Sequence, residues 1–203
     1  AVADNAGYLV DATSPTVSSV AITSATDEQN STLNAGDVVS VTVSMSEAVT
    51  VTGTPRVALD VGGTTVYANY ASGSGTSSLV FTYTIQASQT DANGISIAAN
   101  SVGLNGGTIA DAAGNVATLA HAAVADNAGY LVDTTSPTVS SVAITGATGE
   151  QNSTLNAGDV VSVTVSMSEA VTVTGTPQVG LNVGGTTVQA SYDAASSTST
   201  SLV

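Results

Sequence analysis

Residues 1–70 of this chain recur almost unchanged as residues 123–192, and this internal repeat limits what the chain can fold into. The two stretches are identical at 62 of 70 positions. A repeat of this length corresponds to a whole domain, because solenoid repeats are only about 20–45 residues long. The eight differences are Ala12/Thr134, Ser24/Gly146, Asp27/Gly149, Arg56/Gln178, Ala58/Gly180, Asp60/Asn182, Tyr67/Gln189 and Asn69/Ser191.

The phase of the repeat predicts where the domains begin and end. Short runs around Pro15 and Pro137 are typical of linkers, because proline restricts the backbone of the residue before it. We therefore predict a complete unit over residues 11–132, the last strand of a preceding unit over residues 1–10, and the first part of a following unit over residues 133–203. An isolated half-sandwich would expose open sheet edges, so we expect the parent chain to continue in both directions.

Alternating apolar and polar residues predict strands throughout the repeat. Val39, Val41, Val43 and Met45 share one face of such a strand, and Gly62-Gly63 predicts a tight hairpin. No stretch has a clear helical pattern. The fold class is therefore all-β, with tandem immunoglobulin-like Greek-key sandwiches of seven to eight strands per unit. The expected main strands cover residues 16–23, 37–45, 56–61, 64–70, 79–85, 103–109 and 128–132, and residues 95–97 form a short element.

The charge balance excludes several classes of partner. The chain has 15 acidic residues, Arg56 as its only Lys or Arg, and a net charge of −14. Binding to nucleic acid requires cations that neutralise phosphates, so no nucleic-acid partner is expected. No apolar run is long enough to cross a bilayer, and we expect no membrane insertion. Cysteine is absent, so metal ions rather than disulfides are the cross-links that this chain could use.

Strand direction predicts that four polar side chains converge at the end of the sandwich nearest the preceding unit. Asp11 precedes the first strand, Glu47 follows the second, and Asp111 and Asn115 lie in the loop before the last strand. Carboxylates and amide oxygens are the ligands that Ca²⁺ prefers. We therefore predict a Ca²⁺ site formed by Asp11, Glu47, Asp111 and Asn115. In the second unit, Asp133 and Glu169 are expected to take the roles of Asp11 and Glu47.

Other polar residues have simpler interpretations. The same carboxylates could cap turns, because Asp and Asn side chains bond readily to nearby backbone. Asp91 and Asn93 fit a plain turn, and the Asp-Asn pairs at residues 4–5 and 126–127 fit loops. His121 is the only histidine, whereas zinc sites need several ligands. No Gly-x-Ser-x-Gly nucleophile motif is present, so the chain is not expected to be an enzyme.

Several linked motifs resemble one known family. The stretches DATSPTVSSV (11–20), LNAGDVVSVTV (33–43), MSEAVTVTGTP (45–55), GGTIADAAGN (106–115) and ADNAGYLVD (125–133) are similar to the SWM-type bacterial immunoglobulin-like repeat. The resemblance covers nearly the whole chain. It implies an extracellular location on the bacterial cell surface, in a large adhesin connected with biofilm formation and exported by type I secretion. It also implies a structural, Ca²⁺-stiffened extender whose partners are the neighbouring repeats.

Two other functions remain open from the sequence. The unit could bind glycan or another surface directly, which would require a flat face of regularly spaced threonines or exposed aromatic residues. It could also form a filament by strand addition between molecules. Residues 1–10 are identical to residues 123–132, so they could complete an unfinished unit of another copy.

Overall fold

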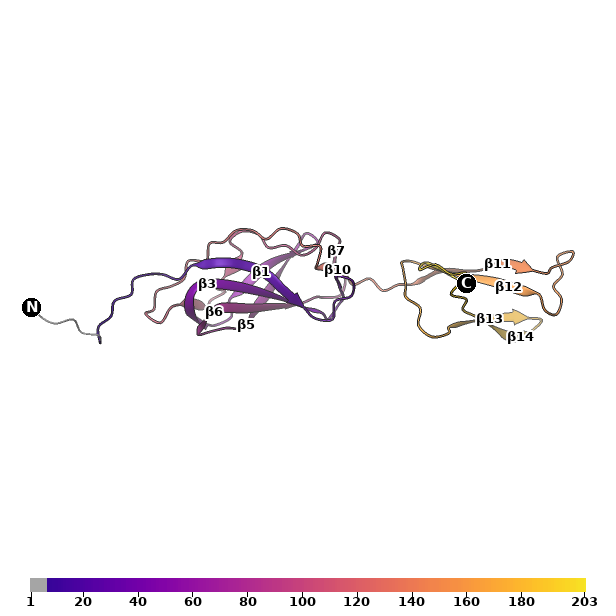
Figure 1. Ribbon diagram of the computed structural model, residues 1–203, viewed down its shortest axis with the longest axis horizontal. Helices are drawn as coiled ribbons and strands as arrows, with labels where there is room; N and C mark the ends of the chain where they lie inside the picture. Colours follow the sequence, from indigo (N-terminus) through magenta and orange to yellow (C-terminus); the bar gives the residue numbers. More distant parts are fainter. Residues whose placement is uncertain (1–6) are drawn as a thin grey trace, which may run out of the picture. The chain divides into compact units, whose positions relative to one another are not determined.

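The chain consists of two compact units that divide between Thr135 and Ser136, inside the linker predicted around Pro137. The computed structural model describes residues 7–203. These residues form strands and turns, with no helix among them (Figure 1). Accordingly, the described chain contains no helix able to cross a lipid bilayer. The all-β prediction is confirmed.

The first unit contains more strands than the seven to eight that were expected, because several pairings are only two residues long. Its longest strand, β3, has 15 residues, whereas β2, β7 and β8 have two each. The ten strands are β1 (Val17–Ala25), β2 (Thr32–Leu33), β3 (Val38–Thr52), β4 (Arg56–Val61), β5 (Thr64–Ser72), β6 (Thr76–Thr84), β7 (Thr90–Asp91), β8 (Val102–Gly103), β9 (Thr108–Ala110) and β10 (Leu131–Asp133).

One large sheet carries most of these strands. Its order is β1-β3-β6-β5-β4-β8, and β9 pairs with the end of β3. A separate small sheet has the order β2-β10-β7, in which β10 runs parallel to β2 and antiparallel to β7. The β3–β6 register shifts between Ser44 and Val49, and β3 then pairs with β9 from Thr50 to Thr52. Strand β3 therefore pairs with β6 along most of its length and with β9 at its end.

Side chains from both sheets form a single hydrophobic core. Alternation along β3 places Val39, Val41 and Val43 in this core, opposite Phe81 of β6. Phe81 contacts Tyr70 edge to face, with ring centroids 5.7 Å apart. The core is made mostly of Val, Ile and Leu, as the composition predicts.

Two expected strands are shorter than their sequence patterns suggest. The strand predicted over residues 103–109 is divided into β8 and β9 by a turn, where Asn105 and Gly106 have positive φ values of 48° and 79°. The last strand starts only at Leu131, because the Tyr130 N–H closes a turn onto the Asn127 carbonyl. In the short element predicted over residues 95–97, Ser96 and Ile97 form isolated bridges instead of a strand. The strand predicted over residues 1–10 lies mostly outside the described residues, and residues 7–10 are exposed and form no strand.

The second unit repeats the first five main strands. Its strands are β11 (Val139–Thr148), β12 (Val160–Met167), β13 (Gln178–Val183), β14 (Thr186–Ser191) and β15 (Ser201–Leu202). They form one sheet of order β11-β12-β15 and a separate β13-β14 hairpin. The β11–β12 register matches the β1–β3 register, shifts included. The same sequence therefore folds the same way locally in both units.

Candidate metal centre

Three carboxylates from distant parts of the sequence meet at one end of the first unit. Asp11, Glu47 and Asp111 each place one oxygen within 4.8 Å of the other two, a separation at which they could jointly hold a metal ion. Within residues 7–203, no other group of three His, Cys, Asp or Glu side chains meets in this way. The predicted convergence of these three residues is therefore found in the structure.

Strand β3 positions Glu47. The residues of β3 alternate, and Met45 and Val49 on either side of Glu47 are both buried. Glu47 thus occupies an inward-facing position of an otherwise apolar face, and its side chain is half-buried. The sequence had suggested that Glu47 follows its strand in a loop, but the strand continues through it to Thr52.

The loop after β9 positions Asp111, whose side chain is buried. Its Oδ1 accepts hydrogen bonds from the N–H groups of Ala113 (2.9 Å) and Asn115 (2.8 Å). Burial alone would raise the pKa of Asp111, but hydrogen bonds from the Asn115 side chain and from the backbone of Asn115, Ala113 and Gly114 outweigh it and lower the pKa. Asp111 is therefore held as a carboxylate, which is the form that binds cations.

Asn115 connects two members of the group. Its Nδ2 donates to Asp111 Oδ2 at 2.8 Å and to the backbone carbonyl of Asp11 at 3.2 Å. The amide nitrogen, rather than the amide oxygen, thus faces the carboxylates. In this orientation Asn115 positions Asp11 and Asp111 relative to each other. Its role as a Ca²⁺ ligand stays a prediction.

The segment before β1 is attached to the same end of the unit. The Thr16 N–H donates to Ser46 Oγ at 3.0 Å, and the Ser46 N–H donates to the Thr16 carbonyl at 2.8 Å. On its other side, the Thr118 N–H donates to the Pro15 carbonyl at 2.8 Å. Asp11 stands just before this clamp and accepts a hydrogen bond from the Thr13 N–H at 2.9 Å. A cation held by Asp11 would add a further point of attachment between this segment and the body of the unit.

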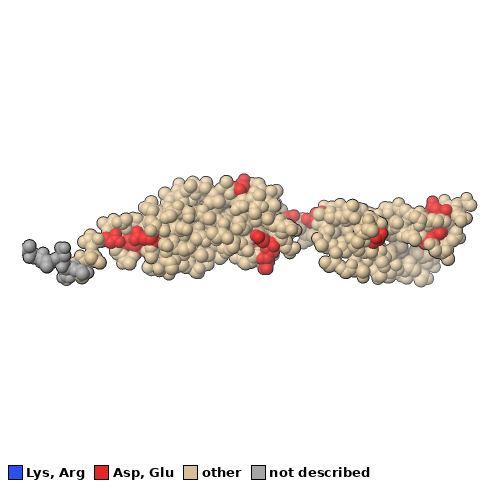
Figure 2. Space-filling model, viewed as in Figure 1, with Lys and Arg blue, Asp and Glu red and all other residues tan. Residues whose placement is uncertain are grey.

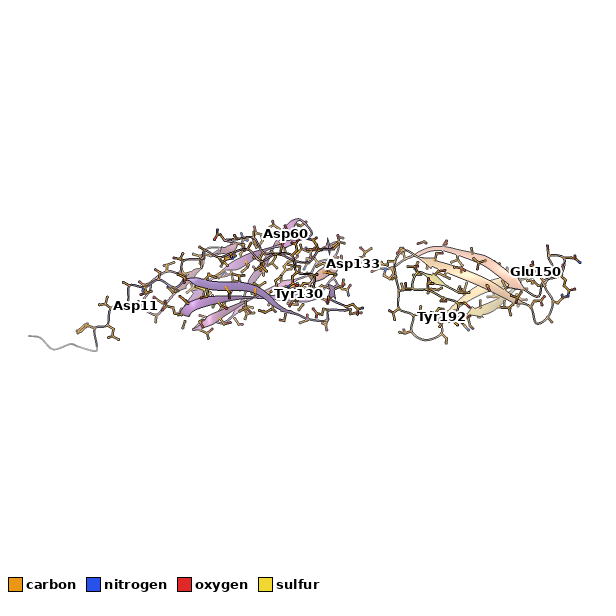
Figure 3. The ribbon with its side chains drawn as sticks, turned by 45° about the horizontal axis from the view of Figure 1, so that its top comes forward. Asp11, Asp60, Tyr130, Asp133, Glu150 and Tyr192 are labelled. Atoms are coloured by element: carbon orange, nitrogen blue, oxygen red, sulfur yellow. The ribbon has the colours of Figure 1, made fainter. Side chains whose placement is uncertain are left out.

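The two remaining predicted ligands belong to different units. Asp133 ends β10 of the first unit, and its Oδ1 accepts the Thr135 N–H at 2.9 Å, as Asp11 accepts that of Thr13. Figure 3 places Asp11 and Asp133 at opposite ends of the first unit. Glu169 lies in the second unit, and its buried Oε1 accepts no hydrogen bond from any described residue. A buried carboxylate oxygen of this kind requires a cation or a donor to offset its lost hydration.

Positive charge from the protein itself is scarce. Most of the visible surface in Figure 2 is uncharged, with acidic side chains in separate small groups. Arg56 is the only Lys or Arg in the chain, and its guanidinium lies 3.8 Å from the centroid of the Tyr67 ring. Carboxylate oxygens within 4.8 Å of one another repel by about 3–4 kcal/mol per pair at an effective dielectric constant of about 20. A bound cation would convert that repulsion into attraction.

Other candidates from the sequence have structural roles. Asp91 is buried, and it accepts hydrogen bonds from the N–H groups of Gly62 and Gly94, both at 2.8 Å. Asn93 Nδ2 donates to Asp126 Oδ2 at 2.6 Å. His121 Nε2 faces the Ser101 N–H at 2.8 Å, so this nitrogen is an acceptor in the fold. The Asp-Asn pair at residues 4–5 lies outside the described residues.

Two buried carboxylates connect loops of the first unit, a role that goes beyond the plain turn predicted at Asp91 and that was not predicted for Asp37. Asp91 joins the Gly62-Gly63 hairpin to the β7 turn, and buried Asp37 accepts the Asn34 N–H at 2.7 Å. The spacing of Asp37 from Asn34 was the available signal, because an Asp side chain can bond the backbone three residues before it.

Comparison of the chain with family models, with curated proteins and with solved structures finds no match.

Proposed function

We propose that this chain is a structural extender from a large bacterial adhesin, built from tandem immunoglobulin-like Greek-key repeats and located at the cell surface or outside the cell. Ca²⁺ bound at the end of each repeat stiffens the connection to the repeat before it. The internal repeat supports the tandem arrangement, and the all-β fold agrees with this class of domain. No catalytic role is proposed.

The observation that carries the proposal is the position of Asp11. It belongs to the segment leading into β1, whereas Glu47 and Asp111 belong to the body of the unit. A cation shared by the three would therefore tie the connecting segment to the domain. Fewer backbone conformations would remain at the junction, and a chain of such repeats would resist bending.

Ca²⁺ fits this group better than the other common divalent ions. All three side chains offer hard carboxylate oxygens, whereas structural zinc sites use mainly Cys and His. Ca²⁺ binds oxygen at about 2.3–2.6 Å, so oxygens on opposite sides of the ion are up to about 5 Å apart. Mg²⁺ usually keeps several of its waters and is bound by only one or two carboxylates. The three oxygens lie within 4.8 Å of one another, which is inside the span of a Ca²⁺ coordination sphere.

Calorimetric titration of the chain with Ca²⁺ tests the proposal. The Glu47→Gln, Asp111→Asn double variant should lose at least tenfold in affinity, because two charged ligands become neutral. Asp60→Asn is the matched control, since the second unit carries Asn182 at this position. The Gly63 N–H donates to Asp60 Oδ1, and the Gly185 N–H makes the same bond to Asn182 Oδ1. Equal Ca²⁺ affinity in the double variant and the control would refute the site.

Small-angle scattering tests the mechanical part separately. With Ca²⁺ the maximum dimension of the chain should increase and its distribution of shapes should narrow, and EDTA should reverse both effects. Ca²⁺ binding without a change in scattering would leave the site intact and refute the stiffening role.

A further inference from the structure

The outer face of the β4–β5 hairpin is the surface at which the two units differ most. Residues of each strand alternate between the core and this face, where they are exposed or half-buried. The units are identical at 62 of 70 compared positions, yet five of the eight differences lie here, whereas the core residues of both strands are unchanged. The hairpin face, as we call these five positions, consists of Arg56/Gln178, Ala58/Gly180, Asp60/Asn182, Tyr67/Gln189 and Asn69/Ser191.

The hairpin backbone does not depend on these differences. Arg56 lies opposite Asn69, and Ala58 lies opposite Tyr67. The corresponding positions of β13 and β14 are opposed in the same register. The two sets of side chains therefore fit the same backbone and differ in what they offer to a molecule outside the sheet. In the first unit the hairpin face carries two charged residues and an aromatic ring, whereas in the second unit it carries neither.

Arg56 is held in place by an aromatic ring and has no hydrogen-bonding partner. Its guanidinium lies 3.8 Å from the centroid of the Tyr67 ring, a cation–π contact with its diagonal neighbour on β5. Within residues 7–203, the Arg56 side chain donates no hydrogen bond and forms no ion pair. On β8 it lies opposite Gly103, which has no side chain to cover it. The planar fork of N–H donors is therefore oriented and available, and such a fork matches the two oxygens of a carboxylate.

A row of free polar side chains continues from Arg56 across the large sheet. Asn69 lies opposite Thr82 of β6, and Thr82 lies opposite Ser40 of β3. In the described part of the chain, the side chains of these three residues form no hydrogen bond. Neighbouring strands are about 4.8 Å apart, so the row offers an amide and two hydroxyls at regular intervals beside the guanidinium. A ligand with one carboxylate and several hydroxyl groups would satisfy these donors and acceptors.

A saccharide fits this surface better than a peptide or a nucleic acid. Strand β4 is paired on both sides, with β5 and β8, and β5 is paired with β4 and β6, so neither strand has a free edge to which an extended peptide could add. A nucleic acid needs several cations, whereas this face has one and the chain has a net charge of −14. A single carboxylate needs only Arg56, and the Tyr67 ring, which is 42% exposed, offers an apolar surface to the C–H groups of a sugar.

We propose that the hairpin face of the first unit binds an acidic saccharide, a sugar that carries a carboxylate and several hydroxyl groups. Arg56 binds the carboxylate, Tyr67 packs against the sugar ring, and the Asn69 amide bonds its hydroxyl groups. The second unit lacks this site, because its Gln178 Nε2 donates instead to Ser191 Oγ at 3.3 Å. This binding goes beyond the stiffening proposed above and requires no metal ion.

NMR titration of the full chain with trigalacturonate tests this proposal. Residues 56–69 differ from their counterparts at five positions, so their amide signals can be distinguished from those of the second unit. Signals on the hairpin face should shift and those of residues 178–191 should not. Ca²⁺ is removed beforehand with a chelating resin, so the result does not depend on the proposed Ca²⁺ site. Salt at about 0.15 M screens repulsion from carboxylates more than about 8 Å away.

The second unit supplies the matched variants. Arg56→Gln and Tyr67→Gln introduce residues that the second unit carries in the same hairpin register, so the fold should be kept. Arg56→Gln should weaken binding at least about tenfold, because hydrogen bonds to the charged ligand are lost. Tyr67→Gln should also weaken it, because the guanidinium is released. The double variant Arg56→Gln, Gln178→Arg keeps the net charge of −14 and should bind no better than Arg56→Gln alone. Asp60→Asn should keep the native affinity or increase it.

Shifts on the hairpin face that are lost in Arg56→Gln and reduced in Tyr67→Gln support the proposal. Absence of shifts at 10 mM trigalacturonate, or equal affinity of the native chain and Arg56→Gln, overturns it. Equal binding of the neutral trisaccharide of galactose would show that no carboxylate is recognised and would also overturn it. Tighter binding of a triglutamate peptide than of trigalacturonate would assign the face to an acidic peptide and refute the saccharide.

Discussion

Replacing Gly62 with alanine should destabilise the first unit far more than the same change at Gly184 destabilises the second. These glycines occupy the same place in the hairpins β4–β5 and β13–β14, with φ values of 57° and 59°. Both hairpins have two consecutive glycines with positive φ, as a two-residue type I′ turn requires. The local backbone is therefore the same, and only the surroundings differ.

The atoms around each glycine determine how much stability the alanine substitution costs. A Cβ on Gly62 would overlap the carbonyl oxygen of Thr90, whereas a Cβ on Gly184 would have nothing within 4 Å. Both substitutions cost about 1–2 kcal/mol for placing alanine in the left-handed region. At Gly62 the hairpin must also move away from β7, and the N–H loses its 2.8 Å bond to Asp91. A hydrogen bond to a charged group contributes about 1.5–3 kcal/mol, so we expect a total near 3–5 kcal/mol for Gly62→Ala.

Hydrogen exchange read by mass spectrometry measures the two units separately. Many peptides are identical in the two repeats, so the probes must be unique: residues 79–110 for the first unit and residues 178–192 for the second. A cost of 3–5 kcal/mol corresponds to a fall in Tm of roughly 10–20 °C for a domain of this size. Gly184→Ala should lower the stability of the second unit by only about 1–2 kcal/mol.

Equal costs at the two positions would refute the reasoning, because the effect would then come from backbone conformation alone. A large cost at Gly62 with unchanged exchange around Thr90 would also contradict it, since the argument requires the hairpin to press on β7.

Three further predictions concern buried groups and hydrogen bonds. Leu33→Ala should cost about 2–5 kcal/mol in thermal unfolding and Leu155→Ala less than about 1 kcal/mol, because the first is fully buried and the second half exposed. Asp91→Asn should destabilise the first unit by about 1–3 kcal/mol, since an amide NH₂ would face N–H donors, and an unchanged melting temperature would contradict the hydrogen bonds assigned to Asp91. Hydrogen bonds from the Ser196 hydroxyl and the Ala195 N–H lower the pKa of Asp193, so NMR titration of the Ser196→Ala variant should show this pKa rising towards its ordinary value. The ionised Asp193 side chain stabilises the fold at pH values above its ordinary pKa. This stabilisation is lost as the pH falls through the lowered pKa.

The sequence by itself determined the local structure of this protein. Period-2 alternation located the main strands, and the residues of β4 were predicted without error. Paired glycines located the hairpin at Gly62-Gly63. The 122-residue period predicted a linker around Pro137, and the two compact units divide between Thr135 and Ser136. These signals are local, because pleat and turn geometry depend on a few neighbouring residues. Even the meeting of Asp11, Glu47 and Asp111 followed from counting strand directions.

Tertiary structure decided everything that depends on which strand lies beside which. The parallel pairing of β10 with β2, the change of partner along β3 and the inward position of Glu47 depend on register over long sequence separations. The orientation of the Asn115 amide is set by two acceptors, one of them more than 100 residues away in the sequence. Most clearly, Leu33 and Leu155 have the same sequence around them, yet one is buried and the other is exposed. Burial depends on the segment that packs against a residue, and no local pattern contains that information.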